Sequence, residues 1–137
     1  MQTEQNQADP APAPARAHDE RRVRRISVIA PMLNESSHIE TFIEDLAAQD
    51  FRGELELLVA DGGSTDGSAA RLKTAGESAG LDLTVIDNPA RWVSPGLNAC
   101  IRRATGDLLV RMDCHTRYPK DYLRTVVVGC GCCPYCF

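Results

Sequence analysis

Short apolar runs alternate with helix-like patterns along most of the chain. Four runs have the length and the aliphatic content of buried strands: 26–30, 55–60, 81–86 and 108–113. Three segments between them repeat apolar residues at every third or fourth position, as one face of a helix does: 39–47, 66–79 and 95–104. Strands that alternate with helices are typical of a parallel sheet wound with helices, so the pattern predicts an α/β fold.

Local signals indicate where some of these helices begin. Ser37 and Glu40, three residues apart, form a capping-box pattern before the first helix. Ser94 followed by Pro95 combines an N-cap residue with a proline at the first helical position. A further helix is predicted to begin at 118–119, a Tyr-Pro pair.

The first 25 residues differ in kind from the rest of the chain. They contain the Ala-Pro repeats, many charges and almost no large apolar side chain, so they cannot bury enough surface to offset the entropy of ordering. We therefore predict a disordered extension over 1–25, followed by a domain over 26–128. The extension closes on four arginines, for which a solvated charge run is favoured over contact with a membrane or nucleic acid: Arg21, Arg22, Arg24 and Arg25.

Charge and hydropathy exclude several classes of protein. A net charge of −4 argues against a general nucleic-acid-binding protein. The first residues lack the apolar segment of a signal peptide, and no run of eighteen apolar residues occurs, so neither export nor a membrane-spanning helix is predicted. We expect a cytoplasmic protein whose contact with the cytoplasmic face of the inner membrane is at most peripheral.

The six cysteines fall into two groups. Cys100 and Cys114 lie singly within apolar segments and are predicted to be small buried residues. The other four crowd the end of the chain: Cys130, Cys132, Cys133 and Cys136. The spacing of the last two is found in metal and redox sites, but two adjacent cysteines make a poor chelate for zinc. An aberrant tail over 129–137, produced by truncation or a shifted reading frame, is therefore favoured over a zinc site.

Polar residues follow each predicted strand. In wound parallel sheets the ligand site lies beyond the carboxyl ends of the strands. We therefore expect these residues to converge on one crevice: Asn34 and Glu35, Asp61 to Asp66, Asn88 and Arg91, and Asp113 and His115. Two successive glycines in the second of these loops would let the backbone approach a ligand closely. Trp92, in contrast, is predicted to pack beneath its loop.

The phosphate-binding motifs of two large classes are absent from the sequence. No Gly-x-Gly-x-x-Gly follows the first strand and no Gly-Lys-Ser/Thr loop occurs, which argues against dinucleotide dehydrogenases and P-loop proteins. Asp113 and His115 instead stand two positions apart after the fourth strand, so in extended backbone both point the same way and reach one cation. A carboxylate with an imidazole suits Mn²⁺ better than Mg²⁺. Arg91 and Arg111 are candidates for extra positive charge there, although Arg111 is equally placed to pair with Asp113.

Four segments in this order resemble the motifs of glycosyltransferase family 2, which has the GT-A type of fold. The first motif of that family is similar to Pro31-Met-Leu-Asn34-Glu35, and the second to Asp61-Gly-Gly-Ser-Thr-Asp66-Gly-Ser. The third region is similar to Asn98 with Ala104-x-Gly106-Asp107, followed by Asp113-x-His115 at the Asp-x-Asp metal motif. Residues 111–119 most resemble the bacterial exopolysaccharide branch of this family, which is of the succinoglycan-biosynthesis type. The resemblance covers about residues 25–125.

The resemblance implies a fold and a set of site residues. The fold is the Rossmann-like GT-A fold of nucleotide-diphospho-sugar transferases, a mostly parallel sheet flanked by helices, here incomplete at the C-terminus. Donor binding is implied for eight residues: Pro31, Asn34, Glu35, Asp61, Gly62, Gly63, Asp66 and Asn98. Within this set, Glu35 is implied near the base or ribose, and Asp61 as the acceptor for the N3–H of uracil. Asp113 and His115 take the place of the Asp-x-Asp pair, which holds Mn²⁺ or Mg²⁺ against the diphosphate.

The implied activity is transfer of a sugar, with inversion, from a nucleotide-diphosphate sugar, a UDP-sugar, to a growing polysaccharide or a lipid-linked acceptor. Such a displacement needs an Asp or Glu base, which we expect beyond the chain end because the sequence stops about twenty residues after His115. We therefore expect the chain to bind a donor without transferring its sugar. A non-catalytic nucleotide-binding module and a protein that uses its cysteine tail for metal binding or interaction remain alternatives. The segment 61–66 also has the composition of a simple polar turn in which Ser64 or Thr65 caps a helix.

Overall fold

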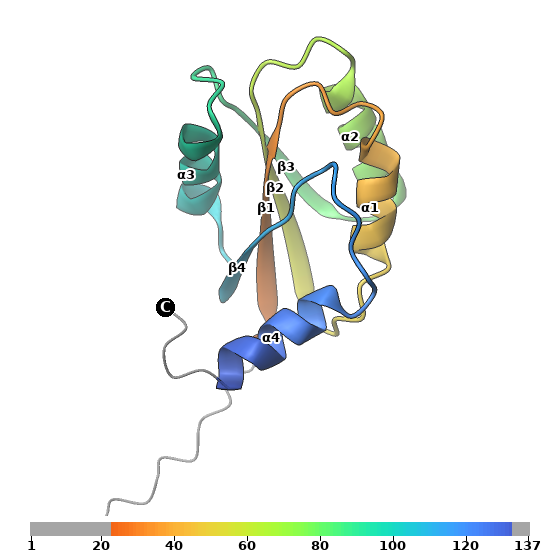
Figure 1. Cartoon of the computed structure of the whole chain (residues 1–137), viewed down its shortest axis with the longest axis vertical. Helices are drawn as coiled ribbons and strands as arrows, with labels where there is room; N and C mark the ends of the chain where they lie inside the picture. Colours follow the sequence, from red (N-terminus) through yellow and green to blue (C-terminus); the bar gives the residue numbers. More distant parts are fainter. Residues whose placement is uncertain (1–22, 133–137) are drawn as a thin grey trace, which may run out of the picture.

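A computed structural model describes residues 23–132, with side chains described up to residue 130. Strands and helices alternate in the following order: β1 (Arg25–Met32), α1 (Ile39–Ala47), β2 (Glu54–Asp61), α2 (Ser68–Ser78), β3 (Asp82–Asp87), α3 (Val93–Arg103), β4 (Leu108–Arg111) and α4 (Tyr122–Cys132). Figure 1 shows the strands side by side with their carboxyl ends at the top and α4 near their amino ends. The predicted α/β fold is confirmed.

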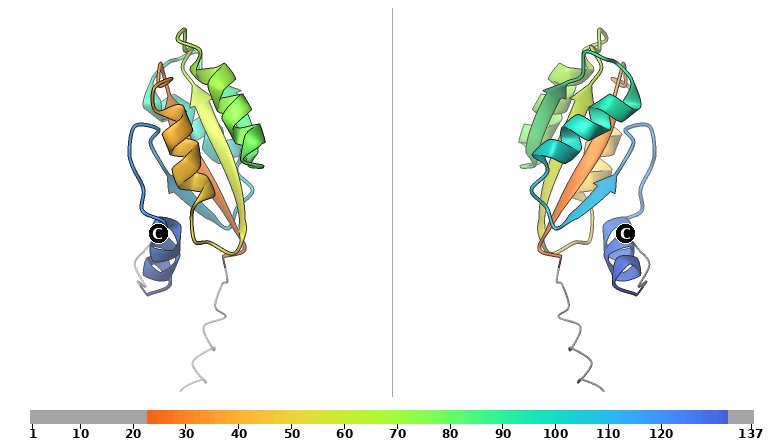
Figure 2. Two further views of the ribbon diagram at one scale, coloured as in Figure 1. Left: turned by 90° about the vertical axis from the view of Figure 1, so that its right-hand side faces the viewer. Right: turned by 90° about the vertical axis from the view of Figure 1, so that its left-hand side faces the viewer.

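The four strands form one parallel sheet in the order β3-β2-β1-β4. Helices α1 and α2 cover one face and α3 covers the other, as the two side views in Figure 2 show. Strands β1 and β2 are therefore buried on both faces, which explains their nearly continuous apolar sequences. The larger core cluster packs Phe42, Leu46 and Leu72 against one face of the sheet, and the smaller one packs Cys100 of α3 against the other.

The predicted helix starts need correction. The capping box of Ser37 and Glu40 is wrong, because α1 has His38 at its N-cap with no side-chain cap. The N–H of Ser36 donates instead to Asp66 Oδ2 at 3.0 Å, so the neighbouring loop supplies the acceptor. Gly67, with a φ of 86°, directly precedes α2. Glycine adopts this left-handed backbone without steric cost. Gly67 is therefore the N-cap residue of α2, and neither Ser64 nor Thr65 caps this helix.

The third and fourth helices also begin away from their predicted positions. Trp92, and not Ser94, is the N-cap of α3, and helical backbone already begins at Val93. The last helix, α4, begins at Tyr122, after the Tyr-Pro pair at 118–119. Strand β4 ends at Arg111, so the two residues predicted to finish this strand lie in the loop that follows it.

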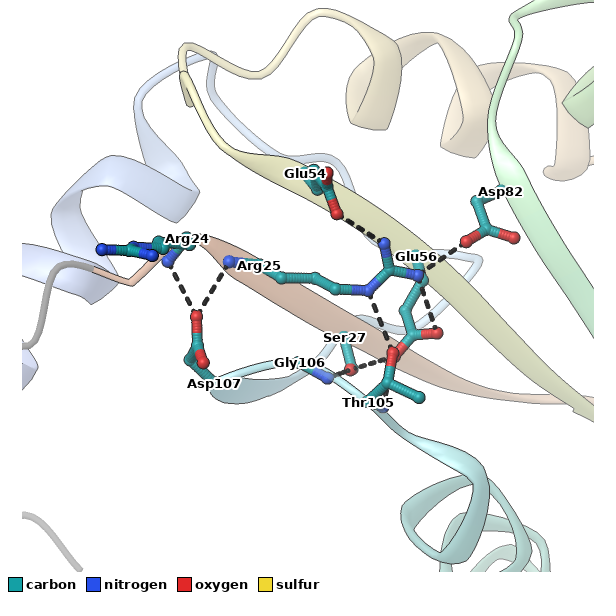
Figure 3. A network of polar contacts seen from close by, with 9 residues as sticks. All are labelled: Arg24, Arg25, Ser27, Glu54, Glu56, Asp82, Thr105, Gly106 and Asp107. Atoms are coloured by element: carbon teal, nitrogen blue, oxygen red, sulfur yellow. Dashed lines mark hydrogen bonds and ion pairs between the residues drawn. The ribbon is translucent and has the colours of Figure 1, made fainter.

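A buried carboxylate of β2 joins this strand to β1 and to the loop before β4, at the amino ends of the strands (Figure 3). Glu56 of β2, which is 7% exposed, accepts hydrogen bonds from the Ser27 hydroxyl of β1 and from the backbone N–H and hydroxyl of Thr105. Arg25 reaches Glu56 at 3.3 Å and also pairs with Glu54 at 2.8 Å and Asp82 at 2.7 Å. The expectation of a solvated charge run is therefore wrong for Arg25, which is the first residue of β1. The earlier residues 1–22 lie outside the described residues, and the extension stays a prediction.

The hydrogen bonds around Glu56 change its acidity. Burial alone would raise the pKa of this carboxyl group, but the bonds from Ser27, Thr105 and Arg25 outweigh it and lower the pKa from 4.5 to about 2. Gly106 completes the arrangement by donating its N–H to the Ser27 hydroxyl at 2.8 Å. A Cβ at residue 106 would lie 2.6 Å from the Ser27 nitrogen, so this approach requires glycine.

Two of the cysteine predictions are tested by the structure. Cys100 and Cys114 are buried, as predicted, and burial raises the pKa of the Cys114 thiol to about 12. Helix α4 continues through Cys132, past the boundary predicted at residue 128. Cys133 and Cys136, and with them the candidate metal-binding tail, lie outside the described residues. Within residues 23–132, no helix is both long and apolar enough to cross a membrane.

We predict that Glu56→Gln destabilises the protein by about 1.5–3 kcal/mol at pH 7, because it removes hydrogen bonds to a buried charge. A lowered folded-state pKa stabilises the fold above the unfolded-state value, and this contribution is lost as the pH falls from 4.5 towards 2. Urea unfolding between pH 7 and pH 3 should therefore show a weaker acid dependence in Glu56→Gln than in the wild type. Glu77→Gln, at an exposed position of α2, is the control. Equal pH dependence in all three proteins would contradict the role of Glu56.

Candidate functional site

A cleft of about 200 Å³ lies at the carboxyl ends of the strands. Its walls come from the ends of β1, β2 and β4 and from the loops that follow β1, β3 and β4. The lining residues are Pro31, Met32, Leu33, Glu35, Ala60, Asn88, Arg91, Trp92, Val93, Arg111, Asp113 and His115. The predicted convergence of strand-end residues on one crevice is confirmed for Glu35, Asn88, Arg91, Asp113 and His115.

Hydrogen bonds join the loop after β1 to the loop after β2. The N–H of Asn34 donates to the Ser64 hydroxyl at 2.9 Å, and the N–H of Thr65 donates to Asn34 Oδ1 at 2.8 Å. Asn34 has a φ of 55°, a left-handed conformation that asparagine tolerates better than most residues. The N–H of Glu35 donates to the Ser68 hydroxyl at 2.9 Å. These bonds set the position from which Glu35 enters the cleft.

Asp66 stabilises the same pair of loops from the side of α2. Its carboxylate accepts hydrogen bonds from the Ser68 hydroxyl, the Ser68 N–H and the Ser36 N–H. The Ser68 hydroxyl is the main cause of the lowered pKa of Asp66, and the two N–H groups act in the same direction. Asp66 thus has its polar partners within the protein and does not line the cleft.

The end of β2 brings a glycine between two cleft walls. A Cβ on Gly62 would lie 3.5 Å from the Cα of Arg91 and 3.6 Å from Leu33 Cδ1, so the loops after β1 and β3 flank this residue. Gly63 follows with a φ of 88° and open space around its Cα. Asp61 accepts bonds through Oδ1 from the Ser64 N–H at 2.9 Å and the Ser64 hydroxyl at 2.7 Å. Asp61 and Ser64 thus form a polar turn, but the helix cap that the polar-turn alternative assigned to Ser64 or Thr65 is wrong, because Gly67 is the N-cap of α2.

The loop after β3 presents a tryptophan to solvent. Trp92 is 77% exposed at the rim of the cleft, so the prediction that it packs beneath its loop is wrong. Its backbone is held by Asn88, which is 6% exposed and donates from Nδ2 to the Trp92 carbonyl at 2.9 Å. Arg91 adopts a φ of 64°, and its N–H donates to the Asn88 carbonyl at 3.0 Å. The buried amide therefore occupies the space below the loop and leaves the indole outside.

The residues after β4 alternate between the core and the cleft. Met112 and Cys114 are buried, whereas Arg111, Asp113 and His115 line the cleft. Arg111 donates from Nε to Asp113 Oδ1 at 2.9 Å and from Nη2 to Oδ2 at 3.3 Å. Of the two roles that the sequence left open for Arg111, the structure has the ion pair with Asp113. His115 Nδ1 lies 3.2 Å from Glu35 Oε1. The resemblance had implied Glu35 near the base or ribose, and the polar partner that the structure gives its carboxylate is this imidazole.

The potential metal ligands in the cleft suit a hard divalent cation that is also coordinated by a bound molecule. Asp113 and Glu35 contribute carboxylates and His115 an imidazole to the same cleft. Within residues 23–130, however, no three side chains of His, Cys, Asp or Glu are grouped closely enough to hold a metal by themselves. Cations such as Mg²⁺ commonly bind to one or two carboxylates, with phosphate oxygens and waters completing the coordination. The residues present fit such a shared site.

The implied donor-binding residues are divided by the structure. Pro31 and Glu35 line the cleft. The lining does not include Asn34, Gly62, Gly63 and Asp66, which lie in the loops after β1 and β2, or Asp61, which is the last residue of β2. Asn98 is exposed on α3 and does not line the cleft. Sequence reasoning missed the apolar lining residues Leu33 and Val93. It missed them because the convergence argument used polar residues after each strand, whereas Leu33 is an apolar residue of the loop after β1 and Val93 is the first residue of α3.

The family model described as Glycosyl transferase family 2 matches residues 27–128. The chain belongs to this family. The succinoglycan biosynthesis protein ExoA of Rhizobium meliloti is 38% identical over 105 residues, which are 73% of this chain and 31% of that protein. The chain thus spans about a third of the length of this relative.

Solved structures of similar chains agree with the fold. The mannosyltransferase PcManGT from Pyrobaculum calidifontis, in complex with GDP-Man and Mn²⁺, is 30% identical with a TM-score of 0.72. That match covers 85% of this chain and 34% of the mannosyltransferase. Residues 1–349 of TarS from S. aureus, in complex with UDP, are 25% identical with a TM-score of 0.67, covering 77% of this chain and 32% of that one. The GT-A fold is thereby confirmed for the part of the chain that matches.

We predict that Gly96→Ala moves the tryptophan loop. A Cβ at residue 96 would lie 2.7 Å from Asn88 Nδ2 and 3.0 Å from the Cβ of Ala60. This overpacking should lower the free energy of unfolding by about 1–3 kcal/mol. The loss should outweigh the roughly 1 kcal/mol by which alanine stabilises a helix relative to glycine. Urea unfolding and the emission maximum of the single tryptophan measure the two effects.

Gly129→Ala on α4 is the matched control, because its Cβ would meet nothing within 4 Å. It should leave the emission maximum unchanged and should not destabilise the protein. A Gly96→Ala variant as stable as Gly129→Ala, with the same emission maximum, would contradict the supporting role of Asn88.

Proposed function

We propose that this chain binds the nucleoside diphosphate of a sugar donor, and that the transferase reaction passes the sugar with inversion to a polysaccharide or lipid-linked acceptor. The observation that supports the proposal is that the two ends of the cleft differ in chemistry, with ionisable side chains at one end and an aromatic ring at the other. At the β4 side stand the carboxylate of Asp113, the imidazole of His115 and the guanidinium of Arg111, and at the β3 side stands the exposed ring of Trp92. A nucleoside diphosphate has the same division, with an aromatic base at one end and a charged diphosphate at the other.

The base end is assigned to the loops after β1, β2 and β3. Leu33 and the backbone of Arg91 flank Gly62, so a flat ring finds apolar surface and a close approach to backbone at one place. Asp61, the residue before this glycine, uses Oδ1 for the turn and leaves Oδ2 without a hydrogen bond from residues 23–130. A carboxylate oxygen in this position suits the N3–H of uracil, and the donor we propose is a UDP-sugar. The solved complex of the related TarS fragment contains UDP.

The diphosphate end is assigned to the residues after β4. Asp113 and His115 would hold a divalent cation, Mn²⁺ or Mg²⁺, against the diphosphate. When bound, such a cation acts as a Lewis acid that neutralises negative charge on the departing diphosphate. The related mannosyltransferase was solved with Mn²⁺. The Asp or Glu base that would take the proton of the acceptor hydroxyl is not assigned to any residue of this chain.

The acceptor and the location belong to the same proposal. Succinoglycan biosynthesis is the process named for the relative from Rhizobium meliloti, and it favours a polysaccharide acceptor. A growing polysaccharide or a lipid-linked sugar would be met at the cytoplasmic face of the inner membrane, where we place this chain. The lipid end of such an acceptor would account for a peripheral contact with the membrane.

We expect Mn²⁺ to raise the affinity for UDP. We also expect UDP binding to change the fluorescence of Trp92, the only tryptophan in the sequence. Asp113→Asn should reduce the Mn²⁺-dependent part of the UDP affinity by roughly tenfold or more, as loss of support at metal sites does. Titration of UDP against tryptophan fluorescence, with Mn²⁺ or with EDTA, measures both effects. Asp121→Asn, at an exposed position just before α4, is the control. Wild-type protein that does not bind UDP under either condition would contradict the proposed function.

Asp61→Asn is expected to weaken UDP binding about tenfold while inorganic pyrophosphate binds as before, because only the nucleotide has a base to contact. The factor corresponds to the loss of a hydrogen bond to a charged group. Asparagine keeps an Oδ1 that accepts from Ser64, so the turn is retained. Competition between UDP and pyrophosphate, read by calorimetry, is the measurement. Equal weakening for both ligands would show that Asp61 acts on the loop and not on the base.

A further inference from the structure

The candidate cation ligand Asp113 already has a positively charged partner. Arg111 grips both of its carboxylate oxygens, with nitrogen–oxygen distances of 2.9 and 3.3 Å. The arginine and aspartate side chains are 50% and 28% exposed, and both line the cleft. A divalent cation that binds to Asp113 therefore meets a guanidinium in the same place, and two positive groups cannot share one carboxylate at close range without mutual repulsion.

The aspartate is held while the arginine is free to turn. The backbone N–H of Asp113 donates to the Tyr118 hydroxyl at 2.7 Å, and the buried side chains of Met112 and Cys114 anchor the backbone on either side. Arg111 has a long, half-exposed side chain at the end of β4, and its ion pair is of the exposed kind that contributes little to stability. The movement that admits a cation is therefore a rotation of Arg111 and not a shift of Asp113.

We propose that Arg111 is an exchangeable counter-ion that couples the binding of the nucleotide and the cation. Without nucleotide, Arg111 occupies Asp113 and opposes the cation. A diphosphate in the cleft offers the guanidinium a second anionic partner with the geometry for two parallel hydrogen bonds. Arg111 then turns to the diphosphate, and Asp113 becomes available to the cation. This inference rests on the proposed function, because it assumes that a nucleoside diphosphate enters the cleft.

The exchange predicts a coupling that is reciprocal. A nucleotide that removes Arg111 from Asp113 raises the affinity for the cation, and the cation must raise the affinity for the nucleotide by the same factor. Part of this coupling exists in any site where a cation contacts a diphosphate directly. The part contributed by Arg111 is the difference between the wild type and a variant that lacks the guanidinium.

The test is a titration of MnCl₂ followed by the electron paramagnetic resonance signal of free Mn²⁺, with and without UDP. Arg111→Gln should bind Mn²⁺ without nucleotide about fivefold or more tightly than the wild type, within the usual range of coupling between sites. Addition of UDP should then raise its Mn²⁺ affinity by a smaller factor than in the wild type. Arg111→Lys keeps the charge but loses the two-pronged contact, and should fall between the two.

Arg102→Gln is the matched control, since Arg102 is exposed in the last turn of α3, at the end of the helix away from the cleft. It should behave as the wild type, and circular dichroism should show unchanged melting for all variants. Equal Mn²⁺ affinity of the wild type and Arg111→Gln, with UDP binding intact by Trp92 fluorescence, overturns the exchange and leaves the proposed function standing. Absence of UDP binding in the wild type overturns both.

Discussion

The parallel pairing of β1 with a strand on each side sets the position of every group in the cleft. β1 pairs with β2 along its whole length and with β4 from Ile26 to Ile29. Because all three strands run the same way, their carboxyl ends meet at one edge, where Leu33, Gly62 and Asp113 follow the strands. A slip of one residue between β1 and β4 would turn Asp113 towards the core and Met112 towards the cleft. The register of this pairing is thus a condition for the site.

The two ends of the sheet use charge in different ways. At the amino ends, Glu56 is buried, accepts hydrogen bonds from three residues and faces a guanidinium that is itself shared by three carboxylates. Such a network is costly to open because every partner would be left without its bond. At the carboxyl ends, the pairs Arg111–Asp113 and Glu35–His115 are partly exposed and each is joined to few other groups. These pairs can exchange partners with a ligand while the rest of the sheet stays in place.

Membership of glycosyl transferase family 2 gives the cleft its chemical context, and the particular residues give it a distinct charge. By the resemblance stated above, His115 takes the place of the second aspartate of the family motif, and Arg111 stands two residues before Asp113. The cleft therefore has a less negative wall than a pair of carboxylates would provide. An imidazole and a guanidinium beside one aspartate favour a site in which the cation is held jointly with an anionic ligand.

Much of this fold could be predicted from the alternation of apolar runs and helical stripes. The runs at 26–30 and 55–60 are buried on both faces of the sheet, and that burial is why they are apolar enough to be identified. The loops that carry Glu35, Asp113 and His115 could be assigned to one crevice, since a parallel sheet collects the ends of its strands at one edge. The helix starts at Ser37 and Ser94 were predicted wrongly, because other side chains bind the backbone before each helix: Asp66, from the loop after β2, accepts from Ser36, and Asn88 donates to the Trp92 carbonyl.

The sequence by itself determined the α/β fold and the chemical types of the cleft residues, because both follow from periodicity and from which residues succeed each strand. Only the tertiary structure decided which of these residues are partners. The exposure of Trp92 depends on a buried amide that lies beneath its loop. The role of Arg25 depends on which carboxylates the strand register places within reach. The contacts of Arg25 with Glu54 and Asp82, and of Glu35 with His115, join residues that are neighbours only across the sheet or between loops, where no local pattern records them.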